Sequence, residues 1–99
     1  MSYQVRFTKA AKSDIVRLYG FLLEHDPAAA RKALAQIEKG IKFLQDFPFT
    51  CRKVTPENSF LREMILSFGA KGYVVLFEIE NNNTVTILAL RHQHEEDYH

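Results

Sequence analysis

The stretch that decides the fold is residues 72–90, which reads Gly-Tyr-Val-Val-Leu-Phe-Glu-Ile-Glu-Asn-Asn-Asn-Thr-Val-Thr-Ile-Leu-Ala-Leu. Residues 73–79 and 84–90 are rich in the β-branched and aromatic side chains that favour strands. Residues 80–83, between them, are mostly asparagine, which tolerates the left-handed backbone conformation of tight turns. The stretch therefore predicts a β-hairpin whose first strand is apolar enough to lie centrally, with both faces covered.

A third strand is predicted just upstream, at residues 60–67, with a turn at 69–72. Three consecutive strands joined by short turns form an antiparallel meander. Residues 50–58 are largely polar and contain a proline, so we expect an exposed loop there.

Two amphipathic helices are predicted before these strands, at residues 9–24 and 27–46. Their apolar residues recur at helical spacing, and Thr8 and Asp26 stand where helix N-caps belong. Pro27 suits the first position of a helix. Because the connection between the helices is so short, they must form an antiparallel hairpin.

The amino-terminal residues 3–7 alternate between apolar and polar side chains, which predicts a short, half-buried strand. The predicted order is therefore β-α-α-β-β-β, in a single domain of residues 1–99. Strands that follow the helices, rather than alternate with them, indicate the α+β class. We expect the helix hairpin to cover one face of a small antiparallel sheet.

The composition excludes several classes of protein. Hydrophobic residues make up 46% of the chain and charged residues 25%, as in ordinary globular domains. Apolar runs such as residues 74–77 are far shorter than the roughly 20 residues of a membrane span. The beginning of the chain lacks an apolar signal core, so a cytoplasmic location is expected. Cys51 is the only cysteine, which excludes an internal disulfide and a multi-cysteine zinc site.

The charges are unevenly distributed although the net charge is only +1. Residues 1–53 hold ten basic and five acidic groups, a local charge of +5. Residues 54–99 hold three basic and seven acidic groups, a local charge of −4. This asymmetry indicates a basic face that could bind an acidic partner. Alternatively, the charges only solvate two amphipathic helices.

Familiar catalytic motifs are missing from the sequence, including a phosphate-binding glycine loop, a zinc-protease motif and a nucleophile elbow. The carboxy-terminal stretch 91–99 contains three histidines and three carboxylates, which are candidate metal ligands. A His-x-His pair points both rings the same way only on a strand, and this stretch is expected to leave one. We therefore favour a polar tail or a partner-contact segment, and predict neither a metal nor a cofactor. Cys51 is interpreted as an incidental loop thiol.

Arg62 is a charged residue in the otherwise apolar row of the strand at residues 60–67. Such an arginine pairs with an acid or faces a groove. Tyr73 opens the next strand and Arg91 closes the last one, so the three side chains could gather on one surface of the sheet. Arginines there would stabilise a phosphorane, and a tyrosine or histidine would move a proton. Alternatively, Arg62 pairs with a nearby carboxylate and only fixes the strand geometry.

The order and spacing of several short pieces point to a known family. These pieces are Tyr-Gln-Val-Arg-Phe-Thr-Lys-Ala-Ala-Lys-Ser-Asp-Ile at 3–15, Phe-Pro at 47–48, Leu-Arg-Glu at 61–63, Gly-Tyr-Val-Val-Leu-Phe at 72–77 and Leu-Ala-Leu-Arg-His-Gln-His-Glu-Glu-Asp-Tyr at 88–98. With its alanine-rich second helix, essentially the whole chain resembles the RelE/ParE toxins of bacterial type II toxin–antitoxin modules. Its Gly-Tyr strand start and its ending are most similar to the ParE branch.

The resemblance implies a toxin that a cognate antitoxin neutralises. ParE-like members inhibit DNA gyrase, and so DNA replication, without known catalysis of their own. RelE-like members are ribosome-dependent endoribonucleases that cut mRNA, and they remain the alternative. Between residues 59 and 90 only Arg62 and Lys71 are basic, whereas the ribonucleases carry a dense set of cations to grip RNA. This difference favours the non-enzymatic, ParE-like reading.

The resemblance also gives candidate site residues and partners. For binding the target or the antitoxin, the candidates are Arg62, Tyr73, Arg91, His92 and Tyr98. In a ribonuclease, the two arginines would stabilise the cleaved phosphate, and His92 or Tyr98 would act as acid or base. The expected partners are the antitoxin and DNA gyrase, in a homodimer or a toxin–antitoxin heterotetramer. Membrane binding and sequence-specific nucleic-acid binding are not expected.

Overall fold

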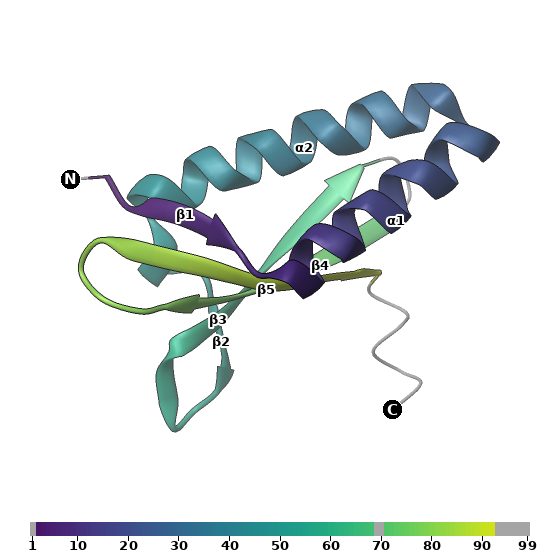
Figure 1. Cartoon of the computed structure of the whole chain (residues 1–99). Coiled ribbons are helices and arrows are strands. Elements are labelled where there is room, and N and C mark those ends of the chain that lie inside the picture. Colours follow the sequence, from purple (N-terminus) through teal and green to yellow (C-terminus); the bar gives the residue numbers. More distant parts are fainter. Residues whose placement is uncertain (1, 69–70, 93–99) are drawn as a thin grey trace.

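Two helices lie on one face of a five-stranded sheet in the computed structural model, which describes residues 2–68 and 71–92 (Figure 1). The strand order across the sheet is β1-β5-β4-β3-β2. The α+β class and the helix hairpin packed on the sheet are as predicted. The elements are β1 (Gln4–Phe7), α1 (Lys9–His25), α2 (Pro27–Asp46), the 3₁₀ helix η1 (Pro48–Thr50), β2 (Arg52–Thr55), β3 (Asn58–Phe68), β4 (Lys71–Ile79) and β5 (Thr84–His92).

The sheet is mixed, and this differs from the antiparallel sheet expected from the sequence. Strands β3, β4 and β5 form the predicted antiparallel meander, in which Leu66 pairs with Tyr73 and Tyr73 with His92. Strand β1, however, runs parallel to β5, with Val5 opposite Val85. The chain reaches this arrangement because the helix hairpin carries it across one face of the sheet before the meander begins (Figure 1).

The prediction of an exposed loop at residues 50–58 was wrong in part. This segment contains the end of η1 and the edge strand β2, which pairs antiparallel with β3. All four residues of β2 are exposed. Because β2 has no buried face, it lacks the apolar alternation by which a strand is identified in a sequence. Its pairing places Lys53 opposite Arg62 and Arg52 opposite Glu63.

Thr8 and Asp26 cap the two helices, as predicted. The Thr8 hydroxyl accepts a hydrogen bond from the Ala11 backbone N–H at 3.1 Å. The Asp26 carboxylate accepts one from the Ala29 N–H, also at 3.1 Å. In the described part of the chain, neither helix has a stretch long and apolar enough to cross a membrane.

The hydrophobic core lies between the helix hairpin and the sheet. Phe77 of β4, Leu44 of α2 and Val85 of β5 are fully buried there. On the opposite face of the sheet, Glu78 is exposed, because both described helices lie on the core face. The expectation that β4 would be covered on both faces was therefore wrong at this residue, although Val74 on that face is buried.

Candidate functional site

Tyr73 and His92 are the two predicted site residues that the fold brings into contact. They are cross-strand partners on β4 and β5, and their rings meet edge to face with 5.0 Å between centroids. Tyr73 is only 6% exposed and belongs to the core, whereas His92 is half-buried. A phenol and an imidazole at this distance are groups that hold or transfer a proton. This pair is therefore the centre of the candidate site.

Arg91 lies beside this pair in the sequence but on the other face of the sheet. Its cross-strand partner is Val74, and successive residues of a strand point to opposite faces. The Arg91 side chain is exposed. The side chains of Arg91 and His92 therefore cannot both contact a ligand that lies against one face of the sheet.

Arg62 lies far from the pair, which corrects the expectation that the predicted site residues gather on one surface. It pairs with Phe77, four positions along β4 from Tyr73, or about 13 Å at the usual rise of a strand. Its guanidinium Nε donates to the Ser59 carbonyl at 2.8 Å. One Nη donates to the carbonyls of Phe49 and Cys51, at 3.1 and 2.8 Å.

Arg62 therefore fixes local geometry, as one of the two alternatives held, but through carbonyl oxygens in place of the expected carboxylate. Its guanidinium also lies over the Phe49 ring, 5.3 Å from the centroid. These contacts tie η1 and the start of β2 to the middle of β3.

Tyr98, the remaining predicted site residue, lies outside the described residues, as do His94 and His99. Within residues 2–68 and 71–92, no three His, Cys, Asp or Glu side chains come close enough to hold a metal ion.

Asp14 is a residue of the site region that the sequence analysis missed. It is 7% exposed, and its Oδ2 accepts a hydrogen bond from the Leu90 backbone N–H at 2.9 Å. Strand β1 ends at Phe7, so the edge of β5 beyond Ile87 has no strand beside it. Asp14 of α1 pairs with that edge instead, and so holds the segment that carries Arg91 and His92. The available signal was its position on the apolar stripe of the helix, between Ala11 and Leu18.

Cys51 is half-buried, and burial raises the pKa of its thiol above the usual value. The nearby Arg62 guanidinium lowers this pKa in turn, but by less than burial raises it. Because the thiolate is the reactive form, the arrangement disfavours Cys51 as a nucleophile at neutral pH.

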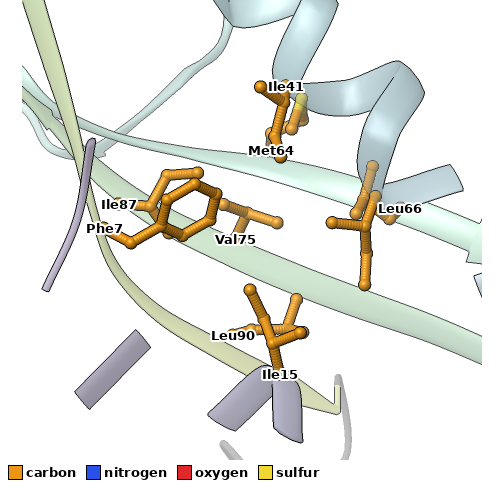
Figure 2. Close-up of a pocket in the computed structure, with 9 residues that line it drawn as sticks. Phe7, Ile15, Ile41, Met64, Leu66, Val75, Ile87 and Leu90 are labelled. Carbon is orange, nitrogen blue, oxygen red and sulfur yellow. The ribbon is translucent and has the colours of Figure 1, made fainter. Parts of the chain in front are cut away.

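A narrow cavity lies inside the core between the helix hairpin and the sheet, close to Ile15, Ile41 and Met64 (Figure 2). Its nine lining residues are all apolar, and the space open to a water-sized sphere is about 10 Å³. A space this small and this apolar holds no more than one water molecule and offers no polar group to a substrate. The cavity is a packing defect of the core rather than a catalytic pocket.

The exposed side of α1 carries a cluster of cations. Lys9, Lys12 and Arg17 surround a shallow hollow in which Val16 is 71% exposed. Arg17 also lies 3.5 Å from the Asp14 carboxylate. An apolar side chain ringed by cations is the surface expected to attract an acidic, partly apolar partner.

The comparisons with known proteins identify the class. Residues 5–97 match the family model of the ParE toxin of the type II toxin–antitoxin system parDE. The chain therefore belongs to the ParE toxin family, and as a type II toxin it has a cognate antitoxin as its partner.

Two individual proteins are also similar to this chain. Toxin RelE1 of Caulobacter vibrioides is 32% identical over 79 residues, which cover 80% of this chain and 82% of that toxin. A solved structure described as the chromosomal ParDE TA system from P. aeruginosa matches with a TM-score of 0.70 at 20% identity. The match covers 92% of this chain and 96% of that one, and at this identity it supports the fold.

Proposed function

We propose that this toxin binds DNA gyrase in the cytoplasm and blocks its strand-passage cycle, so that DNA replication stops, without a reaction catalysed by its own side chains. The observation that carries this proposal is the dispersal of the candidate catalytic groups. Arg62 is about 13 Å along the sheet from the Tyr73–His92 pair, and Arg91 points to the opposite face. A phosphoryl-cleaving site needs its cations and its proton-transfer group around one atom.

The carboxy-terminal end of β5 is the surface we propose for the target. Arg91 is exposed there and His92 is half-exposed, while buried Tyr73 supports the imidazole from β4. Tyr98 follows in the same segment of the sequence and is proposed as a further contact. Arg62 supports the fold at the other end of the sheet and is not proposed to touch the target.

Supercoiling and cleavage-complex assays with purified gyrase test the proposal directly. We expect the toxin to inhibit supercoiling, and Arg91→Glu to need at least a tenfold higher concentration for the same effect. Arg6→Glu is a matched control, because Arg6 is an exposed cation on the edge strand β1. Unchanged supercoiling and no added cleavage at a large molar excess of toxin would rule out gyrase as the target.

A ribosome-dependent mRNA endoribonuclease is the second candidate. Two observations favour it: the similarity to a protein named Toxin RelE1, and the contact between a phenol and an imidazole at Tyr73 and His92. If it is correct, primer extension on translating mRNA will reveal cuts in phase with codons. His92→Gln will then abolish the cuts, and inhibition of purified gyrase will be absent.

The antitoxin is proposed to approach the basic side of the helix hairpin. The hollow of Lys9, Lys12 and Arg17 around exposed Val16 suits an acidic helix with one apolar side chain. Antitoxin segments that fold on binding commonly use such surfaces. A toxin–antitoxin heterotetramer is the assembly we propose, and light scattering of the purified complex would distinguish it from a one-to-one pair.

A further inference from the structure

The end of the sheet farthest from the candidate target surface carries two cations directly opposite each other. Lys53 of β2 pairs with Arg62 of β3, so both side chains lie on the same face of the sheet. Like charges in opposed positions of neighbouring strands destabilise a sheet. The fold therefore keeps an unfavourable pair at this position.

Neither cation of this pair is neutralised within the described residues. The two ion pairs there are Arg17–Asp14 and Arg52–Glu63, and neither involves Lys53 or Arg62. Arg62 is held in place by carbonyl oxygens alone, which orient the guanidinium without cancelling its charge. Lys53 is exposed. The pair thus presents one oriented cation and one exposed cation to an incoming anion.

Two exposed aromatic side chains lie beside the Arg62 end of this pair. Phe49 and Phe60 meet edge to face, with ring centroids 6.2 Å apart, and they are 47% and 53% exposed. The Arg62 guanidinium lies over the Phe49 ring. We call Phe49 and Phe60 the aromatic end of the molecule.

The size of the aromatic end argues against a second copy of the chain as its occupant. Two half-exposed phenylalanine side chains leave roughly 200 Å² of ring surface. A stable dimer buries about 800 Å² on each partner, so this surface alone would not hold two copies together. A segment of a partner that also binds elsewhere on the molecule fits the area better.

The charges beyond the aromatic end argue against a nucleic acid. Phe60 also borders a hollow that Asn58, Glu78, Ile79 and Glu80 line. The two carboxylates there would repel the continuous row of phosphates in RNA or DNA. A peptide avoids this repulsion, because it can place one carboxylate on the cations and uncharged groups elsewhere.

We propose that the aromatic end and the Lys53–Arg62 pair form a docking site for an acidic, apolar segment of the cognate antitoxin. A carboxylate of the segment lies between the two cations, and an adjacent apolar side chain packs on Phe49 and Phe60. The proposal rests on the antitoxin partner of the proposed function and is independent of whether gyrase is the target.

Binding of the purified product of the neighbouring antitoxin gene to variants of the full-length toxin tests this site. We expect Lys53→Glu to weaken the affinity at least tenfold, mainly through faster dissociation, and Phe60→Ser to do the same. Arg6→Glu makes the same change of charge on the opposite edge strand, so its affinity should stay within twofold of wild type. Lys53→Glu should also unfold at no lower temperature than wild type, because it replaces a like-charged pair with an opposite one. Weaker binding by an equally stable toxin cannot come from damage to the fold.

Three outcomes would support or overturn the proposed docking site. Affinities of Lys53→Glu and Phe60→Ser that match Arg6→Glu would overturn the proposal. Unchanged antitoxin affinity, together with Lys53-dependent binding of a fluorescent 12-nucleotide RNA, would overturn it in favour of a nucleic acid. A gyrase assay without antitoxin keeps the two proposals separate. If wild-type toxin leaves gyrase active but Lys53→Glu still loses the antitoxin, the docking site is supported and the target proposal fails.

Discussion

Asp14 illustrates how a single side chain can take the place of a missing strand. Beyond Ile87, the edge of β5 has no neighbouring strand, and side chains of α1 and its N-cap form hydrogen bonds with its backbone. The Thr8 hydroxyl donates to the Leu88 carbonyl at 3.2 Å, and Asp14 accepts from the Leu90 N–H. Leu90 is 4% exposed, so water cannot readily replace that acceptor. One edge of the segment bearing Arg91 and His92 is therefore held by a buried carboxylate, while β4 pairs with its other edge.

We expect Asp14→Ala to lower the free energy of unfolding by about 1–3 kcal/mol, because it leaves a buried N–H without a partner. Asp14→Asn keeps an acceptor oxygen and should cost less. Urea unfolding measures both values, and Ser13→Ala, an exposed neighbour on the same helix, is the control. Equal stabilities of Asp14→Ala and Ser13→Ala would show that the Leu90 hydrogen bond contributes nothing.

Cys51 should make the stability of the domain depend on alkaline pH. Burial raises the pKa of its thiol in the folded protein above the ordinary value of 9.0. A raised folded pKa means that the contribution is fully present below the unfolded pKa and is lost as the pH rises through the folded pKa. Wild type should therefore lose stability relative to Cys51→Ala as the pH rises above the ordinary thiol pKa of 9.0. Comparing the urea midpoints of the two proteins across a series of pH values on both sides of that pKa measures this difference, and parallel pH profiles would contradict the burial of the thiol.

At the scale of elements, the two helical glycines have opposite surroundings. A Cβ atom added at Gly20 on α1 would meet nothing within 4 Å. At Gly40 on α2 it would meet Met64 Cε at 2.9 Å and Leu66 Cδ2 at 3.0 Å. Helix α2 therefore approaches β3 closely at Gly40, whereas Gly20 has no packing reason to lack a side chain within the toxin itself.

We expect Gly20→Ala to stabilise the domain by about 0.5–1 kcal/mol, because alanine is the better helix former. Gly40→Ala should gain less, since Met64 and Leu66 must shift to admit the methyl group. Gly40→Val should be destabilising by about 1–3 kcal/mol, as overpacked cores are. Thermal unfolding of the three variants gives this order, and a Gly40→Val variant as stable as Gly20→Ala would disprove the close approach.

The elements with a regular buried face could be predicted from the sequence, and the others could not. Helix α2 has the predicted bounds, because its alanines, caps and Pro27 are local signals. Strand β2 has no buried face, so its sequence does not alternate between apolar and polar residues. The parallel pairing of β1 with β5 joins residues about 80 positions apart, and no local signal specifies such a contact.

Tyr73 and His92 were named as candidate site residues from the sequence, but their contact could not be predicted. The register near the turn would place Tyr73 opposite Arg91, and a one-residue shift between Leu76 and Phe77 places it opposite His92 instead. The separation of Arg62 from that pair depends on the length of β3 and on carbonyls of η1, neither of which alternation along the strand reveals. Asp14 was missed because its partner is a backbone N–H on a distant strand.

For the whole molecule, the decisive property is the uneven charge. The two helices together carry seven basic and four acidic residues, and they cover one face of the sheet (Figure 1). The positive electrostatic potential of that face extends farther from the protein surface than any single contact does. Surface fields of this kind raise association rates, whereas short-range contacts such as those proposed at the Lys53–Arg62 docking site control dissociation.

We therefore expect the rate at which antitoxin and toxin associate to fall at least tenfold as NaCl rises from about 50 mM to about 500 mM. Over this range the screening length shrinks from roughly 14 Å to roughly 4 Å, so the helix face no longer attracts an acidic chain from a distance. Stopped-flow mixing measures the rate. In the double variant Lys9→Glu/Lys12→Glu, association should be slow already at low salt and its salt dependence shallower, while dissociation stays as in wild type. Lys53→Glu should behave conversely, with near-normal association and fast dissociation. Salt-independent association of the wild-type proteins would mean that the basic helix face does not steer the partner.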